Sequence, residues 1–333
     1  MSLQLEKSQQ QNLLDVQDLK KHFPVSGGSF SKKNRQVVKA LDGITFSLKK
    51  GETLGIVGES GCGKSTMGRA ILRLHEPSSG SIVYEGSDIT HISKKEMKNK
   101  RKDLQIIFQD PYGSLNPRMT IGAMLSEIVE THKIVPKNEV FDYVCQMLVE
   151  VGLQAQHYYR FPHEFSGGQR QRVSIARALC VKPKLIVCDE AVSALDVSVQ
   201  SQVLNLLQRL KKEHELTYLF ISHDLSVVKH VSDRVAVMYL GKMVELADKH
   251  ELYDNPLHPY TQALLSAIPT TKDEKKRERV ILKGDVPSPI NVPSGCRFHT
   301  RCPIATDLCR SAEPEFKEVS KNHFVACHHA LKI

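Results

Sequence analysis

The sequence predicts an α/β protein: a parallel β-sheet covered by helices, an antiparallel sheet at its edge, a helical subdomain and a small cysteine-rich C-terminal extension. Three observations support this prediction. A glycine-rich stretch at residues 58–66 lies between a strand pattern and a helix pattern, unbroken apolar runs recur at residues 185–188 and 219–221, and four of the eight cysteines lie beyond residue 295. Short apolar runs without alternation are typical of parallel strands that are covered on both faces.

Composition narrows the class of protein. The 333 residues are 41% hydrophobic and carry a formal net charge of +9, which suits one large domain or two smaller ones. No run approaches the roughly 18 apolar residues of a membrane-spanning helix, and the first residues lack the pattern of a signal peptide, so we expect a cytoplasmic protein. Basic clusters at residues 94–102 and 272–279 contain no interleaved aromatic residues, so no nucleic-acid partner is expected.

Hydrophobic periodicity gives the order of elements. Strand patterns occur at residues 13–23, 37–48, 53–57, 81–84, 105–108, 185–188, 219–221, 235–239 and 242–246. Helix patterns occur at residues 67–74, 121–131, 140–151, 199–210 and 261–267, and residues 174–179 lie on a helix that residues 166–169 open. The first two strands should form the antiparallel edge sheet, and the last two should form a hairpin around Gly241. The character of the chain changes near residue 252, where we place a boundary between residues 13–251 and 252–333.

Residues 58–65 match the phosphate-binding pattern G-x-x-x-x-G-K-[ST] at every fixed position. Its glycines allow backbone N–H groups to approach phosphate oxygens closely. Lys64 should place its charge near the β- and γ-phosphates, and the Ser65 hydroxyl should ligate Mg²⁺. The loop residues that we expect to bind the nucleotide are Gly58, Ser60, Gly61, Cys62, Gly63, Lys64, Ser65 and Thr66.

Carboxylates follow one of the buried strands. Asp189 and Glu190 end the apolar run at residues 185–188, and the carboxyl end of a parallel strand beside a phosphate loop is where an acid that orients Mg²⁺ belongs. Glu190 is then placed to act as general base toward water. Gln109 follows another strand, where its amide should contact both Mg²⁺ and the attacking water. His223 follows the next strand along and is a third catalytic candidate.

The stretch Phe-Ser-Gly-Gly-Gln at residues 165–169 narrows the class further. The order of motifs from residue 58 to His223 resembles the nucleotide-binding domain of ABC transporters, over roughly residues 13–250. The resemblance implies a P-loop NTPase with a RecA-like core that hydrolyses ATP. It also implies a head-to-tail dimer, with ATP between the phosphate loop of one subunit and the Ser-Gly-Gly-Gln turn of the other. The residues that this assigns to the nucleotide or to the facing subunit are Ser166, Gly167, Gly168, Gln169 and Asp196.

Members of this family usually stack an aromatic side chain on adenine, upstream of the phosphate loop. Phe23 is the first candidate in this sequence. Phe30 is the second, because the Gly/Ser-rich insertion at residues 26–34 blurs the register.

Three regions resemble the ATPase subunits of bacterial oligopeptide and dipeptide importers: residues 108–117, residues 255–269 and the cysteine-rich tail. Residues 165–172 and 192–198 are more similar to the F-type subunit of these importers than to its D-type partner. One departure from the pattern is Ala191, at a position where proline is common. The ATPase of a nickel importer and a soluble ABC ATPase outside transport are the alternatives.

This resemblance implies a set of partners. They are a second, D-type ATPase that forms a heterodimer with this chain, two transmembrane permeases and an extracytoplasmic substrate-binding protein. The chain would then lie at the cytoplasmic face of a bacterial membrane.

The cysteines of the tail have the spacing C-x₅-C-x₆-C-x₁₇-C, formed by Cys296, Cys302, Cys309 and Cys327. Clustered thiols in a reducing compartment suggest a metal or an iron–sulfur cluster, and the resemblance to importer ATPases implies [4Fe–4S]. Zinc and free thiols or disulfides are the alternatives. The histidines that keep zinc open are His299, His323, His328 and His329. We expect the extension to be separate from the nucleotide core, so that ATP binding is independent of these cysteines.

Overall fold

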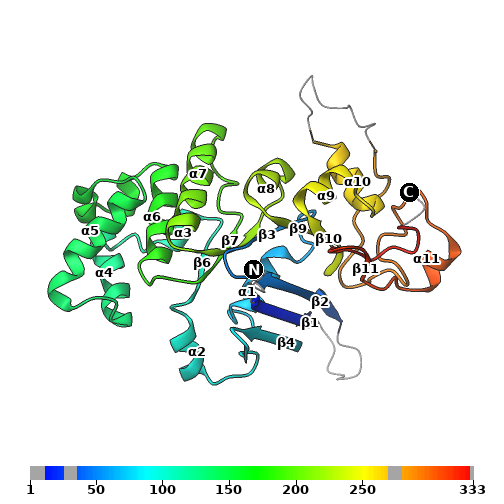
Figure 1. Ribbon diagram of the computed structural model, residues 1–333, viewed down its shortest axis with the longest axis horizontal. Helices are drawn as coiled ribbons and strands as arrows, with labels where there is room; N and C mark the ends of the chain where they lie inside the picture. The colour runs from blue at the N-terminus through cyan, green and yellow to red at the C-terminus, as the bar shows by residue number, and fades with distance from the viewer. Residues whose placement is uncertain (1–11, 26–35, 269–279, 331–333) are drawn as a thin grey trace, which may run out of the picture.

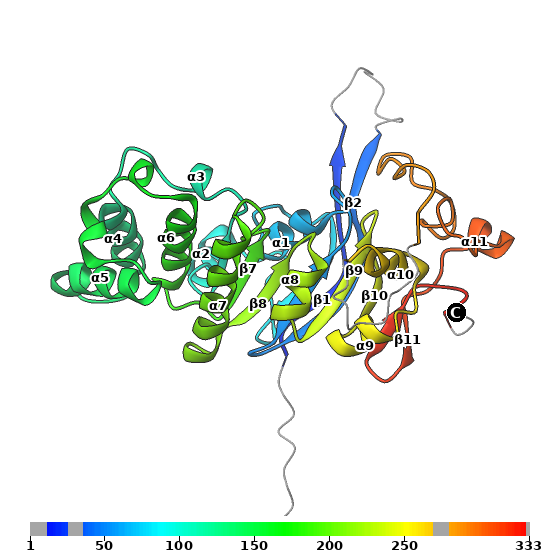
Figure 2. The same cartoon turned by 90° about the horizontal axis from the view of Figure 1, so that it is seen from above.

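The structure is a computed structural model that describes residues 12–25, 36–268 and 280–330. Helices α4 and α5 lie at one end of an elongated molecule and the C-terminal extension lies at the other, with the sheets between them (Figures 1 and 2). Phe30 and the basic cluster at residues 272–279 lie outside the described residues.

The predicted antiparallel edge sheet is confirmed. Its strand order is β2-β1-β4-β5, and β1 pairs antiparallel with both of its neighbours. The strands are β1 (Asn12–Pro24), β2 (Val37–Lys49), β4 (Ser79–Tyr84) and β5 (Ser87–Asp88). From Leu14 to Gln17 in β1, the buried Leu14 and Val16 alternate with the more exposed Asp15 and Gln17, which is the pattern of a strand covered on one face.

The main sheet has the strand order β11-β12-β10-β9-β3-β8-β7-β6. Strands β6, β7, β8, β3 and β9 pair in parallel, and β9 and β10 form the predicted hairpin. Its strands are β3 (Thr53–Val57), β6 (Leu104–Ile107), β7 (Leu185–Asp189), β8 (Thr217–Ile221), β9 (Arg234–Tyr239), β10 (Lys242–Asp248), β11 (Lys317–Ser320) and β12 (His323–Val325).

Helices cover both faces of this sheet. The helices are α1 (Lys64–Ile71), α2 (Lys94–Lys100), α3 (Pro111–Ser114), α4 (Ile121–His132), α5 (Val140–Glu150), α6 (Gly167–Leu179), α7 (Val197–Glu213), α8 (Leu225–Val231), α9 (Lys249–Asp254), α10 (Pro259–Ser266) and α11 (Asp307–Ser311). Every predicted helix is present, although α1 begins earlier than predicted. The sequence did not predict the short helices, because a helix of two turns or fewer shows no readable hydrophobic periodicity. Within the described residues, no helix is long and apolar enough to cross a membrane.

The buried parallel strands divide the core into two layers. All five residues of β3, of β7 and of β8 are buried. Ile186 and Phe220 belong to the cluster that includes α6 and α7, whereas Val187 and Leu219 belong to the cluster that includes α1 and the edge sheet. Neighbouring residues of a strand point to opposite faces, so the unbroken apolar runs in the sequence supply both layers.

The C-terminal extension is part of this main sheet. Strand β12 pairs antiparallel with β10, and β11 extends the sheet by one more strand. The buried Phe298 packs against Tyr239 and Tyr260, with ring centroids 5.3 Å from each. The expectation that the extension forms a separate unit is therefore wrong, because its hairpin and its aromatic side chain share the main core. The boundary near residue 252 stays a prediction.

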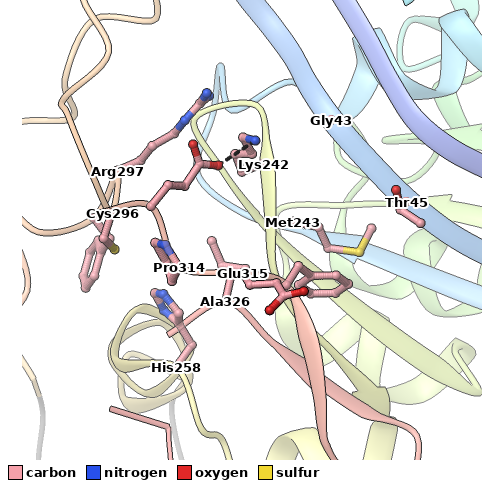
Figure 3. A pocket seen from close by; sticks show the side chains of 14 residues that line it. Gly43, Thr45, Lys242, Met243, His258, Cys296, Arg297, Pro314, Glu315 and Ala326 are labelled. Atoms are coloured by element: carbon pink, nitrogen blue, oxygen red, sulfur yellow. Dashed lines mark ion pairs between the residues drawn. The ribbon is translucent and has the colours of Figure 1, made fainter. Parts of the chain in front are cut away.

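A cavity of about 340 Å³ lies along the seam between β10 and the extension (Figure 3). Lys242 pairs with Glu313 at 2.7 Å beside it, and His258, Cys296 and Arg297 also line it. Burial lowers the pKa of His258 to about 4, so this histidine is neutral at physiological pH. No residue of the phosphate loop lines this cavity, which therefore lies apart from the nucleotide site.

A buried carboxylate fastens the extension to β10. Glu245 is fully buried, and its Oε1 lies 2.7 Å from Nε2 of the equally buried His323 in β12. The same carboxylate accepts hydrogen bonds from the backbone N–H groups of Leu257 and His258, at 2.7 and 3.0 Å. One side chain thus holds β12 and the segment that leads into α10.

We predict that Glu245→Gln destabilises the protein by about 3 kcal/mol, because an amide nitrogen in place of Oε2 cannot accept the hydrogen bond from the backbone N–H of His258 and the buried negative charge beside His323 is lost. Denaturant unfolding measures the loss, and hydrogen exchange should show faster exchange in β12. Glu251→Gln is the matched control. Its carboxylate lies 3.7 Å from the other side of the His323 ring and is about half exposed, so the change should be within about 0.5 kcal/mol. Equal effects of the two substitutions would contradict the assignment.

Candidate nucleotide-binding and hydrolysis site

The phosphate loop connects β3 to α1 and depends on glycine at two close approaches. Gly58 has φ +150° and Gly63 has φ +108°. A Cβ atom at Gly58 would lie 2.2 Å from the carbonyl oxygen of Met238, and one at Gly63 would lie 2.3 Å from that of Ala40. No side chain fits at these distances, so the curl of the loop requires glycine at both positions.

Lys64 is buried inside this curl. Its ammonium donates to the carbonyl oxygens of Gly58 at 2.7 Å and Glu59 at 3.1 Å, and only 4% of the residue is exposed. The Cys62 thiol lies 4.0 Å from the ammonium, and burial raises the pKa of this thiol. The loop therefore holds one fixed positive charge, as a site for phosphates requires.

Ser65 and Asp189 form the oxygen pair expected of a magnesium site. The Ser65 hydroxyl donates to Oδ1 of Asp189 at 2.6 Å, and Asp189 is 2% exposed. Arg69 approaches the second oxygen, Oδ2, at 3.5 Å. A hydroxyl and a carboxylate are hard oxygen ligands, so the donor set fits Mg²⁺, which would neutralise charge on the β- and γ-phosphates.

The predicted catalytic residues meet at Glu190. The side-chain amide of Gln109 donates to Oε2 of Glu190 at 2.9 Å, and Nδ1 of His223 lies 3.3 Å from the same oxygen. Glu190 has φ +49°, a left-handed conformation that costs energy for a residue with a side chain. The structure therefore brings together an acid, an amide and an imidazole from the loops after β7, β6 and β8, a set suited to binding and deprotonating a water molecule.

The Ser-Gly-Gly-Gln turn caps α6. The Ser166 hydroxyl accepts from the backbone N–H of Gln169 at 3.4 Å, and the Gln169 side chain accepts from the backbone N–H of Ser166 at 3.0 Å. Gly168 is needed here because a Cβ atom would lie 2.4 Å from a methyl group of Val199. The N-terminus of this 13-residue helix is the kind of end that attracts anions.

Asp196 has a capping role in this structure. Its carboxylate accepts from the backbone N–H of Val199 at 2.9 Å and from the Ser198 hydroxyl at 2.7 Å, which begins α7 and lowers the pKa of Asp196. Over the described part of the chain, no hydrogen bond or ion pair joins residues 166–169 or Asp196 to the phosphate loop of the same molecule. Their assignment to the nucleotide stays a prediction that depends on a facing subunit.

Phe23 lies near the end of β1. Its ring makes an edge contact with His75 at 5.5 Å between centroids, and the Lys21 ammonium lies 4.9 Å from the ring centroid. Its assignment to adenine stays a prediction.

Sequence reasoning missed three residues that contact this site. Arg69 was not considered, although it follows Ser65 by one helical turn and approaches Asp189 on the same face. Arg301 and Tyr260 were also missed. They come from the C-terminal extension and contact Glu59 in the phosphate loop. The sequence signal that could have indicated a nearby cationic side chain was Glu59, an acidic residue in a loop that binds anions.

The comparisons with known proteins agree with this geometry. The family described as "ABC transporter" matches residues 41–193, and the family described as "Oligopeptide/dipeptide transporter, C-terminal region" matches residues 244–309. The chain is 58% identical to the oligopeptide transport ATP-binding protein AppF of Bacillus subtilis, over 96% of this chain and 98% of that protein. It is 52% identical to OppF of Salmonella typhimurium (96% of each chain) and 48% identical to the dipeptide protein DppF of Escherichia coli (97% and 96%).

Solved structures agree as well. The protein cbiO1 of Clostridium perfringens, part of an ABC transporter complex, is 28% identical and aligns with a TM-score of 0.62 over 73% of this chain and 91% of that chain. The ATP-binding cassette MJ0796, solved as a dimer bound to ADP and Pi, is 25% identical with a TM-score of 0.62 over 71% and 98%.

The fold and the site define an ATP-hydrolysing protein with a phosphate loop, a Ser–Asp pair for Mg²⁺ and a carboxylate positioned for water. More particularly, the chain belongs to the family of oligopeptide and dipeptide ABC transporter ATP-binding proteins. The F-type resemblance and the ABC ATPase fold predicted from the sequence are confirmed, and the chain is an ABC ATPase.

We predict that Glu190→Gln preserves ATP binding and slows hydrolysis at least about 100-fold, because the base that accepts the proton of water is lost. Lys64→Ala should instead lose ATP binding, since it removes the charge held inside the loop. Binding of a fluorescent ATP analogue and phosphate release distinguish the two. Hydrolysis should be measured with the general base of any partner ATPase also replaced. Near-normal turnover by Glu190→Gln under that condition would rule out its assignment.

Proposed function

We propose that this chain is the ATP-hydrolysing subunit that powers import of oligopeptides or dipeptides through a membrane ABC transporter. The observation that carries the proposal is the combination, in one chain, of the ABC transporter domain and its phosphate-loop site with the C-terminal region of oligopeptide/dipeptide transporters. The names of its relatives support the same substrate class, since AppF, OppF and DppF are described as oligopeptide or dipeptide transport proteins. No observation favours nickel import or an activity outside transport.

We further propose that the chain works in a complex. Ser166–Gln169 and Asp196 make no hydrogen bond or ion pair with the phosphate loop within the described chain, so a facing ATPase, of the D type, would complete each ATP site. Two permeases and an extracytoplasmic substrate-binding protein would complete the importer. The chain would bind to the permeases at the cytoplasmic face of the cell membrane. Residues 111–117, which include α3 and the exposed Tyr112, are the surface that we assign to that contact.

The test is transport by the reconstituted importer. Adding the second ATPase and both permeases should raise the ATPase rate well above that of the chain alone, because each site needs a turn from the facing subunit. Liposomes that contain the complex should accumulate a labelled peptide with ATP, and the Glu190→Gln complex should not. Uptake of Ni²⁺ without peptide uptake would overturn the substrate assignment, and full ATPase activity of the isolated, dilute chain would overturn the partnership.

We also propose that Cys296, Cys302, Cys309 and Cys327 hold a [4Fe–4S] cluster. Burial, with smaller contributions from the Cys309, Cys327 and Cys302 thiols, raises the pKa of Cys296 to about 11, which indicates that the four thiols lie near one another. Among the described residues, no three of these cysteines have sulfur atoms that all lie within 4.8 Å of one another, so they do not form a site for a single ion. A cubane is larger than one ion and holds its four thiolates farther apart.

The histidines that would favour zinc are mostly engaged elsewhere. His323 contacts Glu245, His299 contacts the carbonyl oxygen of Cys296, and His328 contacts that of Ala312. Among the hydrogen bonds of the described residues, His329 is the one of these four histidines whose ring contacts a thiol, with Nε2 3.5 Å from Sγ of Cys309. A four-thiolate set is therefore better supported than a mixed Cys/His site.

We predict that protein purified without oxygen is brown, absorbs broadly near ~400 nm and contains about four irons per chain. Cys302→Ser should lose the colour and the iron. Cys145→Ser is the control. Cys145 lies on α5, far in sequence from the four tail cysteines, so this substitution should leave the colour and the iron content unchanged. Colourless protein with one zinc per chain would refute the cluster, and so would protein without metal.

A further inference from the structure

Glu59 poses an electrostatic problem for the site. It lies in the phosphate loop between Gly58 and Ser60, where ATP brings several negative charges. Its side chain is 27% exposed, so water screens its charge only in part. An unpaired carboxylate at this position would repel the phosphates that the loop is built to bind.

Arg301 of the C-terminal extension neutralises this carboxylate. Its two terminal nitrogens donate to the two oxygens of Glu59 at 2.7 and 2.9 Å, and the Arg301 side chain is 7% exposed. The hydrogen bonds to Glu59 raise the pKa of Arg301, so the guanidinium stays charged. A bidentate pair of this kind fixes orientation as well as charge, because the planar fork matches both oxygens at once.

A second group of the extension holds the backbone of the same residue. The backbone N–H of Glu59 donates to the hydroxyl of Tyr260 at 2.9 Å. Tyr260 is fully buried in α10, and its ring packs on Tyr239 and Phe298 at 4.8 and 5.3 Å between centroids. The guanidinium of Arg301 lies 5.9 Å from the ring centroid of Tyr239. Both contacts with Glu59 therefore rest on one packed aromatic cluster.

Glu59, which Arg301 and Tyr260 hold in place, also contacts Lys64. The carbonyl oxygen of Glu59 accepts a hydrogen bond from the Lys64 ammonium at 3.1 Å. Arg301 and Tyr260 thus fix the carboxylate and the N–H of the residue whose carbonyl helps to orient the lysine. The chain of contacts runs from the extension to the charge at the centre of the loop.

We propose that Arg301 is a positioning residue for ATP binding, which neutralises Glu59 and holds it in the conformation that orients Lys64. By this proposal the extension tunes the affinity of the phosphate loop for ATP. The proposal concerns ATP binding by this chain alone, so it stands or falls independently of the transported substrate.

The experiment measures ATP affinity of the full-length chain by displacement of a fluorescent ATP analogue in the presence of Mg²⁺. Arg301→Ala should raise the Kd for ATP about tenfold, because the carboxylate of Glu59 is then uncompensated near the phosphates. Arg310→Ala is the matched control. Arg310 pairs with Asp307 in the same extension, but both side chains are well exposed, at 63% and 97%, so its Kd should be unchanged.

Rescue separates positioning from a loss of structure. In the Arg301→Ala background, Glu59→Gln removes the uncompensated charge and should restore the Kd to within about threefold of wild type. In assembled complex, Arg301→Ala should raise KM for ATP while kcat stays within about twofold, since Gln109, Glu190 and His223 do not contact Arg301. Such a split is not expected from a variant that merely unfolds part of the molecule.

If Arg301→Ala does not fold, Arg301→Lys takes its place. Lysine keeps the charge but loses the bidentate fork, so a Kd about threefold above that of wild type is expected. If the folded variant, Arg301→Ala or Arg301→Lys, binds ATP with the wild-type Kd, the proposal is overturned. Weakened binding that Glu59→Gln fails to restore would also overturn it, because the loss would then come from the extension as a structural support.

Discussion

The parallel pairing of β6, β7, β8 and β3 is the constraint on which the site depends. Strands that run in the same direction end at the same edge of a sheet, so the loops that follow them meet there. Each of these loops supplies one group: Gln109 after β6, Glu190 after β7, His223 after β8 and the phosphate loop after β3. Complete burial of the central strands fixes their register, since a slip by one residue would exchange the two core layers.

The C-terminal extension adds a second constraint. Its side chains contact the phosphate loop from the side opposite to Gln109, Glu190 and His223. Strands β11 and β12 continue the main sheet, and Phe298 joins the aromatic cluster under Tyr260. These contacts leave Arg301 with little freedom, and a side chain with little freedom can hold its partner at low entropic cost. The phosphate loop is thereby held by groups whose positions are fixed by the core.

Much of this could be predicted from the sequence because the signals are local. The glycines of the loop, the apolar runs of β7 and β8 and the acids that end β7 are adjacent in the chain, and the structure has all of them where the patterns predicted. The short helices α2, α8, α9 and α11 carry too few residues to show a period. The hairpin of β11 and β12 was missed because its two strands have only four and three residues, and only pairing with β10 gives them a place.

The contact between Glu59 and Arg301 joins residues 242 positions apart, so no local pattern could reveal it. An acidic residue in an anion-binding loop does imply a nearby cation, but a chain with 46 Lys and Arg residues offers many candidates. This contact also changes how the cysteines should be understood. Cys302 follows Arg301 directly, and Cys296 precedes Arg297, which pairs with Asp42 in β2. Two of the four cysteines proposed to hold a cluster are therefore adjacent to the arginines that fasten the extension, so ATP affinity and the state of the thiols cannot be treated as properties of separate units.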